Sequence, residues 1–474
     1  MAETTMLKFV DRAQAYPAKR AADARANDFQ EVVAEFIIAR AEEQAGRCSQ
    51  CGVPYCQVHC PLHNNIPDWL RLTAEGRLEE AYEISNATSS MPEICGRICP
   101  QDRLCEGNCV IEKDFGAVTI GAVEKFITDT AWEQGWVKPL RAVADRSGQS
   151  VGIVGAGPAG LTAAEMLRIK GYEVHVYDRH DRAGGLLTYG IPGFKLEKPV
   201  VERRIARLVA GGIHLHLNFE VGRDATLDEL RSRHDAVLIA TGVYAARDVA
   251  VPGVETPGVV AALDYLIRSN RRGFGDTVPD AADFDAAGKH VVVIGGGDTA
   301  MDCVRTAVRQ GAASVKCLYR RDRANMPGSQ REVAHAEEEG VEFVWLSAPA
   351  AIVDGVVLAD RMRLGQAGPD GRRAPEPHEA GRFRVDADLV IKALGFDPED
   401  LPRAFAAPDL GVNRWGTLRI DHTTMATSLD GVFAAGDIVR GASLVVWAIR
   451  DGRDVAARMH QYLAAKAGAL RVAA

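Results

Sequence analysis

Two short runs near the start of the chain hold eight of its ten cysteines. The first run is Cys48-x2-Cys51-x4-Cys56-x3-Cys60-Pro61, and the second is Cys95-x3-Cys99-x5-Cys105-x3-Cys109. Thiolates at such spacings bind metal, and the 2-4-3 spacing closed by Cys-Pro is more typical of iron–sulfur clusters than of zinc. In runs of this type the cysteine before the proline ligates the other cluster of a pair. The runs therefore predict two interleaved clusters, which carry electrons one at a time.

Two glycine-rich turns recur with an offset of 140 residues, from Gly155 to Gly295. Each follows an apolar strand and opens a helix, which is the context that a dinucleotide fingerprint requires. The glycines permit close approach of a pyrophosphate, and the helix N-terminus faces the phosphates. A purely structural turn is the alternative, which two full contexts in one chain disfavour. The predicted contacts are Gly155, Gly157, Pro158, Ala159 and Gly160 in the first cradle, and Gly295, Gly297, Asp298, Thr299 and Ala300 in the second.

The strand after each cradle indicates which nucleotide it holds. Strand 173–177 ends at Asp178, about 20 residues past the glycines, where an acid suits a ribose diol. Strand 315–319 ends instead at Arg320 and Arg321. Two guanidinium groups there suit a 2′-phosphate, so the second nucleotide is expected to be NADP(H) rather than NAD(H). The alternative is a solvated basic turn.

Two further strand ends could complete a flavin site. Strand 432–435 ends in Gly436 and Asp437, whose carboxylate could accept hydrogen bonds from a ribityl chain. The apolar stretch from Ser443 predicts a helix whose N-terminus could stabilise negative charge on a reduced flavin. Strand 236–240 runs into Thr241 and Gly242 near the same nucleotide. Ordinary structural strand ends explain these residues equally well.

Composition describes a soluble α/β protein of about three domains, with 47% hydrophobic and 25% charged residues. The net charge of −8 leaves no basic footprint for nucleic acid. No apolar run approaches the ~18 residues that span a bilayer, and the N-terminus lacks a signal-peptide pattern. Clustered thiols without an export signal favour a reducing compartment, so the protein is expected in the cytoplasm, with no membrane partner.

Secondary structure is expected to change along the chain. Residues 1–147 are predicted to be mostly helical, with short helices around 69–72 and 78–84. Apolar residues recur at helical spacing over 29–37 and predict another helix before Cys48. The polar stretch 145–150 is expected to be a linker. Strands alternating with helices then predict parallel sheets.

Taken together, these motifs resemble the small-subunit family of NADPH-dependent bacterial glutamate synthase, over essentially the whole chain. The N-terminal half of dihydropyrimidine dehydrogenase shares the layout. The resemblance implies a helical domain with two 4Fe–4S clusters (1–147), an FAD domain in two segments (148–285 and 425–474), and an inserted Rossmann-like NADPH domain (286–424). It adds Arg179, Gly185 and Leu186 to the cofactor contacts through the motifs at 178–179 and 183–187.

The resemblance also bears on the cluster ligands. The related dehydrogenase holds one cluster with three cysteines and a glutamine, and the matching position here is Glu124. This implies one cluster on Cys48, Cys51, Cys56 and Glu124 and the other on Cys60, Cys99, Cys105 and Cys109. Cys95 would then be a spare buried thiol. The alternative keeps Cys95 as the last ligand in place of Glu124.

The expected activity is electron input to glutamate synthesis. By resemblance, NADPH gives a hydride to FAD, and the clusters carry single electrons to a large (α) subunit in a hetero-oligomer. No side chain need act as acid or base, so no catalytic residue is assigned. A disulfide reductase is disfavoured because 184–192 holds no cysteine pair, and Cys303 and Cys317 are expected in the core. A related reductase serving ferredoxin or a pyrimidine dehydrogenase stays open, as does a zinc-stabilised binding module.

Overall fold

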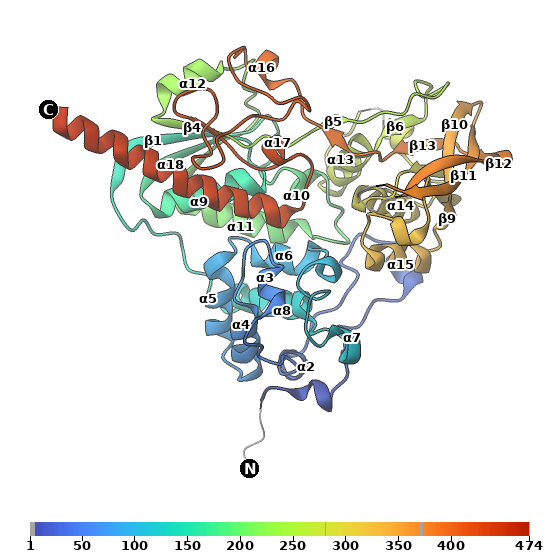
Figure 1. Cartoon of the computed structure of the whole chain (residues 1–474), viewed down its shortest axis with the longest axis horizontal. Helices are drawn as coiled ribbons and strands as arrows, with labels where there is room; N and C mark the ends of the chain where they lie inside the picture. Colours follow the sequence, from blue (N-terminus) through green and yellow to red (C-terminus); the bar gives the residue numbers. More distant parts are fainter. Residues whose placement is uncertain (1–4, 280, 369–372, 474) are drawn as a thin grey trace.

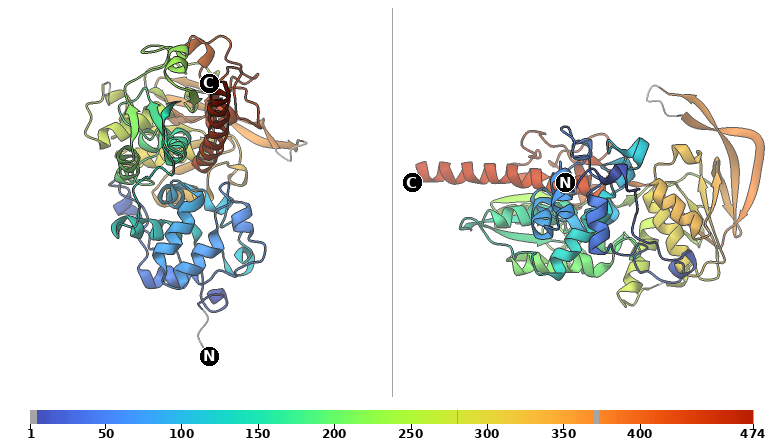
Figure 2. Two further views of the ribbon diagram at one scale, coloured as in Figure 1. Left: turned by 90° about the vertical axis from the view of Figure 1, so that its left-hand side faces the viewer. Right: turned by 90° about the horizontal axis from the view of Figure 1, so that it is seen from below.

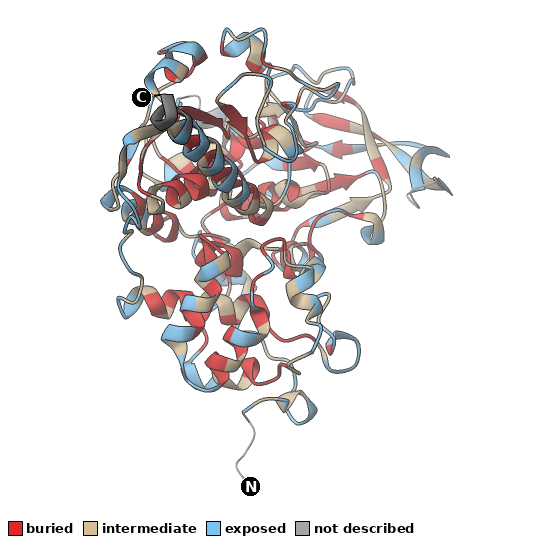
Figure 3. Cartoon of the chain, turned by 60° about the vertical axis from the view of Figure 1, so that its left-hand side comes forward, coloured by how far each residue is buried: buried red, intermediate tan, exposed pale blue. Residues whose placement is uncertain are grey.

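The computed structural model describes residues 5–279, 281–368 and 373–473, which form three units (Figure 1). A helical unit, drawn in blue, lies below two α/β units. In Figure 3 the buried residues of the α/β units lie on the strands and on the helices that face them, and the helical unit has a core of its own. The expected fold class, a helical domain followed by two Rossmann-like domains, is confirmed.

Short helices make up the helical unit, and Trp69 and Ile127 are among the side chains fully buried between them. The helices expected around 69–72 and 78–84 are present as α4 and α5. Its elements are η1 (Lys8–Val10), α1 (Ala22–Arg25), α2 (Ile38–Ala45), α3 (Tyr55–Val58), α4 (Ile66–Ala74), α5 (Leu78–Thr88), α6 (Pro92–Ile98), η2 (Gln101–Arg103), α7 (Glu112–Phe115) and α8 (Ile120–Glu133).

The helix expected over 29–37 is wrong. This segment is extended, and its backbone pairs with other parts of the chain: the Val32 amide donates to Phe194 O, and the Ala34 amide donates to Ala18 O. Val32 is buried, whereas Ile37 is 69% exposed. The apolar spacing therefore reflects contacts with other segments and not one face of a helix. We call residues 14–37 the N-terminal strap.

The first α/β unit is a parallel sheet in the order β15-β4-β1-β2-β3. The expected linker 145–150 enters β1, although the register of β1 with β2 shifts between Arg146 and Ser150. One face packs against helices α9 and α18. The strands are β1 (Arg146–Val154), β2 (Tyr172–Tyr177), β3 (Ile213–His216), β4 (Ala236–Ile239) and β15 (Val432–Ala434). The helices are α9 (Pro158–Ile169), α10 (Leu186–Tyr189), α11 (Lys198–Ala210), α12 (Leu227–Arg233), α16 (Leu401–Ala404), α17 (Asp437–Arg440) and α18 (Val445–Ala473).

The second α/β unit repeats this order in the parallel sheet β6-β13-β7-β8-β9. An antiparallel sheet, β10-β11-β12, covers part of it and projects from the molecule (Figure 2). The strands are β6 (Val259–Ala261), β7 (His290–Ile294), β8 (Ser314–Tyr319), β9 (Glu342–Trp345), β10 (Ser347–Val353), β11 (Val356–Ala367), β12 (Arg373–Asp386) and β13 (Leu389–Lys392). The helical elements are α13 (Ala262–Gly273), η3 (Ala281–Phe284), α14 (Asp298–Arg309), η4 (Arg323–Asn325) and α15 (Gln330–Glu338).

Strand pairing differs from the expected domain limits of 286 and 424. β6 precedes residue 286 yet pairs with β13 of the second sheet. Leu401, Phe405 and Leu418 precede residue 424 yet lie in the core of the first unit. Between them, β5 (Ala245–Ala246) pairs with β14 (Phe396–Asp397) where the chain crosses from one unit to the other. We therefore place both boundaries at this two-stranded ribbon.

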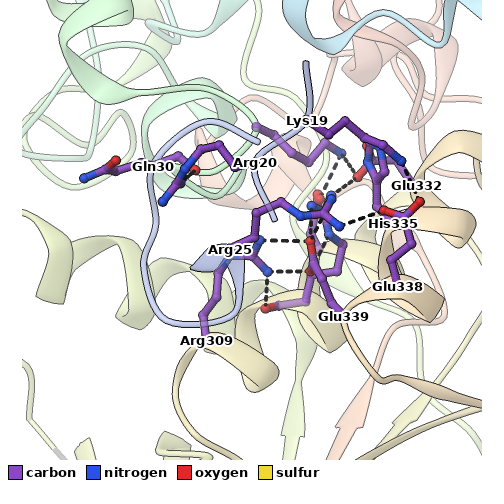
Figure 4. Close-up of polar contacts among 12 residues, drawn as sticks. Lys19, Arg20, Arg25, Gln30, Arg309, Glu332, His335, Glu338 and Glu339 are labelled. Carbon is purple, nitrogen blue, oxygen red and sulfur yellow. Dashed lines mark hydrogen bonds and ion pairs between the residues drawn. The ribbon is translucent and has the colours of Figure 1, made fainter. Parts of the chain in front are cut away.

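Ion pairs join the three units. Arg204 of the first α/β unit binds Glu93 of the helical unit through contacts of 2.7 and 2.8 Å, and both side chains are buried. On the second unit, Arg25 of the strap binds Glu338 at 2.7 Å and lies 3.6 Å from Glu339, which Arg309 of the same unit also binds (Figure 4). The strap thus fastens the helical unit to α15 and to the segment that follows it.

Candidate functional site

The first cradle is a close-packed turn between β1 and α9. Gly155 has φ +110°, and a Cβ there would lie 2.3 Å from Ala240 O. A Cβ on Gly160 would lie 2.0 Å from Gly155 O, so only glycine lets α9 pack this closely. Gly157, in contrast, has no neighbouring atom within 4 Å of its Cβ position. Backbone contacts at Gly155 and Gly160 thus fix the turn, while the space beside Gly157 stays open, as a phosphate cradle requires.

The predicted loop 183–187 lies against this cradle. The Gly184 amide donates to Ala156 O at 2.8 Å. A Cβ on Gly185 would lie 2.9 Å from the Gly157 Cα atom, and Leu186 begins α10 beside it. Pro158 and Ala159 form the first turn of α9, so the predicted residues of this group lie together.

Asp178 ends β2 at the edge of a cavity of about 110 Å³. Its Oδ2 accepts a hydrogen bond from the Ala156 amide at 2.7 Å, so the acid also braces the cradle. The Arg179 guanidinium already has partners within the protein: it forms an ion pair with Glu399 at 2.9 Å and stacks on the Tyr244 ring. The Thr241 hydroxyl is buried without a hydrogen-bond partner and lines the same cavity.

Tyr244 and Glu399 were missed by the sequence reasoning. Both line the cavity beside Asp178, and Glu399 comes from a segment expected in the other domain. No local pattern marks them, because only the return of the chain through the β5–β14 ribbon brings residue 399 to residue 179.

The C-terminal strand end lies beside the first cradle, as the sequence suggested. A Cβ on Gly436 would lie 3.0 Å from the Ala159 Cβ atom. Asp437 begins α17, and burial raises its pKa although the Ser443 hydroxyl donates to it at 2.7 Å. The expected helix after Ser443 is present as α18, and it packs along α9. Gly242 follows β4 beside Thr241, with its Cβ position 3.3 Å from the Tyr244 ring.

The second cradle has the same geometry. Gly295 has φ +148°, and a Cβ there would lie 2.2 Å from Ala393 O. Gly297 has no neighbouring atom within 4 Å of its Cβ position, and the buried Ala300 takes the place of the third glycine. Thr299 lies in the first turn of α14. Asp298 instead makes internal contacts: its Oδ1 accepts from the Ser329 amide at 2.9 Å, and its Oδ2 lies 3.4 Å from Arg103 of the helical unit.

Arg320 and Arg321 follow β8 directly, at the strand end that corresponds to Asp178. Among the residues that the structure describes, neither guanidinium forms an ion pair with a carboxylate. Arg320 is exposed, and the Arg321 Nε atom is buried without a hydrogen-bond partner. This strand end therefore offers two cations that no acid of the described chain neutralises.

The cysteines form two adjoining groups. In the outer group, Cys51 and Cys109 are neighbours of the thiols of Cys48 and Cys56. In the inner group, Cys99 has Cys95, Glu124 and Cys105 as neighbours. A small cavity of about 30 Å³ is lined by Cys60, Cys95, Cys99, Cys105 and Glu124, together with Val446 of α18. Cys105 also has Cys56 as a neighbour, so the two groups adjoin.

This grouping contradicts the partition implied by the resemblance, in which Glu124 joined the outer group and Cys109 the inner one. Glu124 lies on α8, which packs against α6, the helix that holds Cys95. Its carboxyl therefore meets the inner group. Cys109 closes a turn on Glu106 O and lies with the outer thiols. Cys60, before its proline, lines the same cavity as Cys95, Cys99 and Cys105 of the second run.

Burial governs the protonation of these groups. It raises the pKa of Cys48 and Cys60 to about 11 and that of Cys56 to about 12. It also raises the pKa of Glu124 to about 8, although the Ser85 hydroxyl lies 3.4 Å from Glu124 Oε1. Ligands must be deprotonated to bind iron, so cluster assembly here releases protons.

A cavity of about 950 Å³ lies away from all these residues. It runs beneath the N-terminal strap, between Val32, Phe126 and His335. None of the predicted cofactor or cluster residues lines it. The size of a cavity is thus a poor guide to the chemistry of this chain.

Two family models match the chain. Residues 25–136 match the model described as dihydropyrimidine dehydrogenase domain II, 4Fe-4S cluster, and residues 149–452 match pyridine nucleotide-disulphide oxidoreductase. The glutamate synthase (NADPH) small chain of Azospirillum brasilense is 67% identical over 99% of this chain and 98% of its own length. This chain belongs to the glutamate synthase small-chain family.

Other members of the small-chain family are more distant. That of Escherichia coli is 46% identical over 95% of this chain. The putative oxidoreductase AegA of Escherichia coli is 44% identical over 98% of this chain, which spans 72% of AegA. Among solved structures, FprA of Mycobacterium tuberculosis in complex with NADPH has a TM-score of 0.56 at 21% identity, over 68% of this chain and 86% of its own. This last likeness concerns the fold alone.

Small-chain membership makes the chain an NADPH-dependent oxidoreductase with FAD and 4Fe–4S centres. The disulfide-reductase alternative finds no support, because Cys303 and Cys317 are buried separately in α14 and β8. Among the described residues, no helix is both long and apolar enough to cross a membrane.

Proposed function

We propose that this chain is the electron-input subunit of a glutamate synthase. It oxidises NADPH and delivers electrons to a large subunit, which makes glutamate from glutamine and 2-oxoglutarate. One observation carries the proposal: Val446, at the start of α18, lines the cavity of the inner cysteine group. The same helix start lies just past Asp437, beside the first cradle. The part of the first unit around Asp437, where we place the flavin, and the inner cysteine group are therefore neighbours.

FAD suits the first cradle. The open space before Gly157, the unpartnered Thr241 hydroxyl and the cavity beside Asp178 together fit a dinucleotide. In this assignment Asp178 orients the ribose while holding the Ala156 amide in place. Asp437 would bind the ribityl chain, and the N-terminus of α18 would supply positive potential to the ring. The loop that carries Gly185 and Leu186 would cover the pyrophosphate of the FAD.

NADPH suits the second cradle. The space before Gly297 is open, and Arg320 and Arg321 carry no carboxylate partner within the described chain. Their guanidinium groups would bind the 2′-phosphate through charge-assisted hydrogen bonds. The Asp298 carboxylate accepts a hydrogen bond from the Ser329 amide and so positions the first turn of α14. We therefore expect Asp298 to support the cradle more than to bind the nucleotide itself.

Two 4Fe–4S clusters suit the two cysteine groups. The outer group offers Cys48, Cys51, Cys56 and Cys109, and the inner group offers Cys60, Cys99 and Cys105 with either Glu124 or Cys95 as the fourth ligand. When bound, the flavin accepts a hydride and the clusters pass on single electrons. The protein holds the two centres side by side and keeps water from the buried inner group.

A related reductase remains the second candidate. AegA, a putative oxidoreductase, is nearly as similar to this chain as the Escherichia coli small chain is, at 44% against 46% identity. The higher identity to the Azospirillum small chain, 67%, favours glutamate synthase. A cytoplasmic location stays a prediction, which the ten free thiols of the chain support.

Reconstitution tests the proposed function. The purified chain, mixed anaerobically with a glutamate synthase large chain, is expected to form glutamate from glutamine and 2-oxoglutarate at the expense of NADPH. The chain alone is expected to oxidise NADPH with an artificial acceptor and to form no glutamate. A mixture that oxidised NADPH and reduced a ferredoxin, but formed no glutamate, would instead favour the related reductase over glutamate synthase.

The inner cluster can be tested by removing each candidate ligand. We expect Glu124→Ala to lose the iron of one cluster, because the inner group then lacks its carboxylate. Cys95→Ala should keep the wild-type iron content and cluster absorbance. Iron per chain, measured against flavin per chain, checks both variants. Loss of iron in Cys95→Ala alone would assign the fourth position to that thiol.

A further inference from the structure

Four histidines and a glutamate gather on one face of the first sheet, away from the predicted cofactor and cluster residues. β2 and β3 are parallel, with His175 directly beside His214 and Tyr177 beside His216. Alternation along a strand places Glu173 on the same face as His175. Val174 and Val176 point to the other face and share the core with α9. His234 completes the group, with its ring centroid 5.1 Å from that of His175.

The donor atoms of three of these side chains converge. Glu173, His175 and His214 each offer one ligand atom, and all three atoms lie within 4.8 Å of one another. His175 Nε2 lies 3.0 Å from Glu173 Oε1. The other ring nitrogen, Nδ1, lies 3.0 Å from His216 Nε2. The site is accessible, because the Glu173 side chain is 44% exposed and His214 is exposed.

We propose that Glu173, His175 and His214 bind a divalent transition-metal ion of the zinc class. Imidazole and carboxylate together suit zinc, nickel and copper, and three protein ligands leave a tetrahedral position for water. Zinc binds nitrogen and carboxylate oxygen at about 2.0–2.2 Å, which brings the two donors to a separation close to that of His175 Nε2 and Glu173 Oε1. The ion takes the place of the proton between these atoms, and that proton leaves to solvent.

The surroundings of His175 support its role as a ligand. A metal-bound imidazole generally donates its second N–H to a neighbouring acceptor, which fixes the ring and its tautomer. With the ion on Nε2, His175 Nδ1 carries hydrogen and donates to His216 Nε2. His216 is in turn stacked on Tyr177, with ring centroids 4.5 Å apart. Only His214 then has to move toward the ion.

Metal binding at this place would fasten the edge of the first sheet. β3 is the terminal strand of the order, and His214 is its contribution to the site. The backbone of the same strand holds Asp178, whose amide donates to His216 O at 2.9 Å. The ion therefore cross-links β3 to β2 just before the strand end that faces the proposed FAD ribose.

Equilibrium dialysis of the untagged holoprotein against buffered Zn²⁺ tests the proposal. Zinc, iron and flavin per chain are measured for the wild type, His214→Asn and Glu173→Gln. Both changes are at accessible positions, so the fold should persist, which unchanged flavin and iron content verifies. His290→Asn is the matched control, because His290 is exposed on β7 of the other unit.

The wild type and His290→Asn should bind one equivalent of zinc more than His214→Asn and Glu173→Gln. Added zinc should also raise the thermal midpoint of the first two proteins and not that of the other two, because only a folded site binds the ion. Equal zinc content in all four proteins would overturn the proposal. Because zinc binding to cysteine thiols would be common to all four, it cannot imitate the expected difference.

Discussion

The two α/β units have the same sheet order and the same cradle, yet they offer opposite charge at the next strand end. Gly155 and Gly295 hold their turns in the same way, each against a backbone carbonyl about 2 Å from the missing Cβ. After the neighbouring strand, the first unit has Asp178 and the second has Arg320 and Arg321. The backbone thus provides a phosphate site in both, and the strand end selects the nucleotide.

The units also differ in how they are attached. Between the first unit and the helical unit, Arg204 and Glu93 form a fully buried pair, and the neighbouring Arg203 binds Asp129. The second unit is held by a network in which Glu339 accepts from Arg305 and Arg309, beside the strap residue Arg25 (Figure 4). Removing one member of a buried ion pair costs about 3–5 kcal/mol. The first unit is thereby fixed to the cluster-bearing helices, and the second is held both by the strap and by the helical unit, where Arg331 of α15 binds Glu106 at 3.0 Å.

The largest expected effect separates the two cradles. Gly155→Ala should abolish flavin binding, because the new Cβ meets Ala240 O and φ is positive. Gly295→Ala should keep flavin and iron while NADPH oxidation falls by more than about a hundredfold, or about 2.7 kcal/mol. Flavin and iron per chain and the rate of NADPH oxidation check both variants.

Gly273→Ala is the matched control for these changes, because nothing lies within 4 Å of its Cβ position at the end of α13. It should behave as the wild type. Loss of flavin in Gly295→Ala, with flavin retained and NADPH oxidation lost in Gly155→Ala, would reverse the assignment of the two cradles.

A smaller effect is expected at the attachment of the second unit. Although burial alone would raise the pKa of Glu339, hydrogen bonds from Arg309 and Arg305 lower it to about 2. The unfolded-state pKa is about 4.3, so the ionised group stabilises the fold by about 3 kcal/mol at neutral pH. This contribution is complete above pH ~4.3 and disappears as the pH falls toward 2.

Glu339→Gln should therefore lower the thermal midpoint at neutral pH, and its difference from the wild type should shrink as the solution is acidified below pH ~4.3. Thermal unfolding followed by circular dichroism over a pH series measures the difference. Glu337→Gln serves as the control, because Glu337 is a partly exposed partner of Arg323 outside the buried network. A difference that did not depend on pH would show that the charge of Glu339 is not what stabilises the attachment.

Local features could be predicted from the sequence, and features made by the return of the chain could not. Both cradles, the strand ends at Asp178 and Arg320, and the helix after Ser443 follow from short patterns of strand, glycine and helix. The strap could not be predicted, because its backbone partners, such as Phe194, lie far along the chain.

The same limit applies to the cofactor contacts and cluster ligands. The Cys-Pro spacing predicts that Cys60 joins the second run, whereas only the packing of α8 on α6 brings Glu124 to the inner group. Likewise Glu399 reaches Arg179 only through the ribbon between the units. The histidine group combines both cases: alternation within β2 and β3 is visible in the sequence, whereas the register between them is not.

Coenzyme selection by the second unit tests the central claim most directly. NADPH and NADH oxidation with an artificial acceptor should be measured for the wild type and for Arg320→Ala with Arg321→Ala. Each lost guanidinium–phosphate hydrogen bond costs about 1.5–3 kcal/mol. The KM for NADPH should therefore rise by about tenfold to a hundredfold. The KM for NADH and the flavin content should stay unchanged. Equal increases for the two coenzymes would contradict the account.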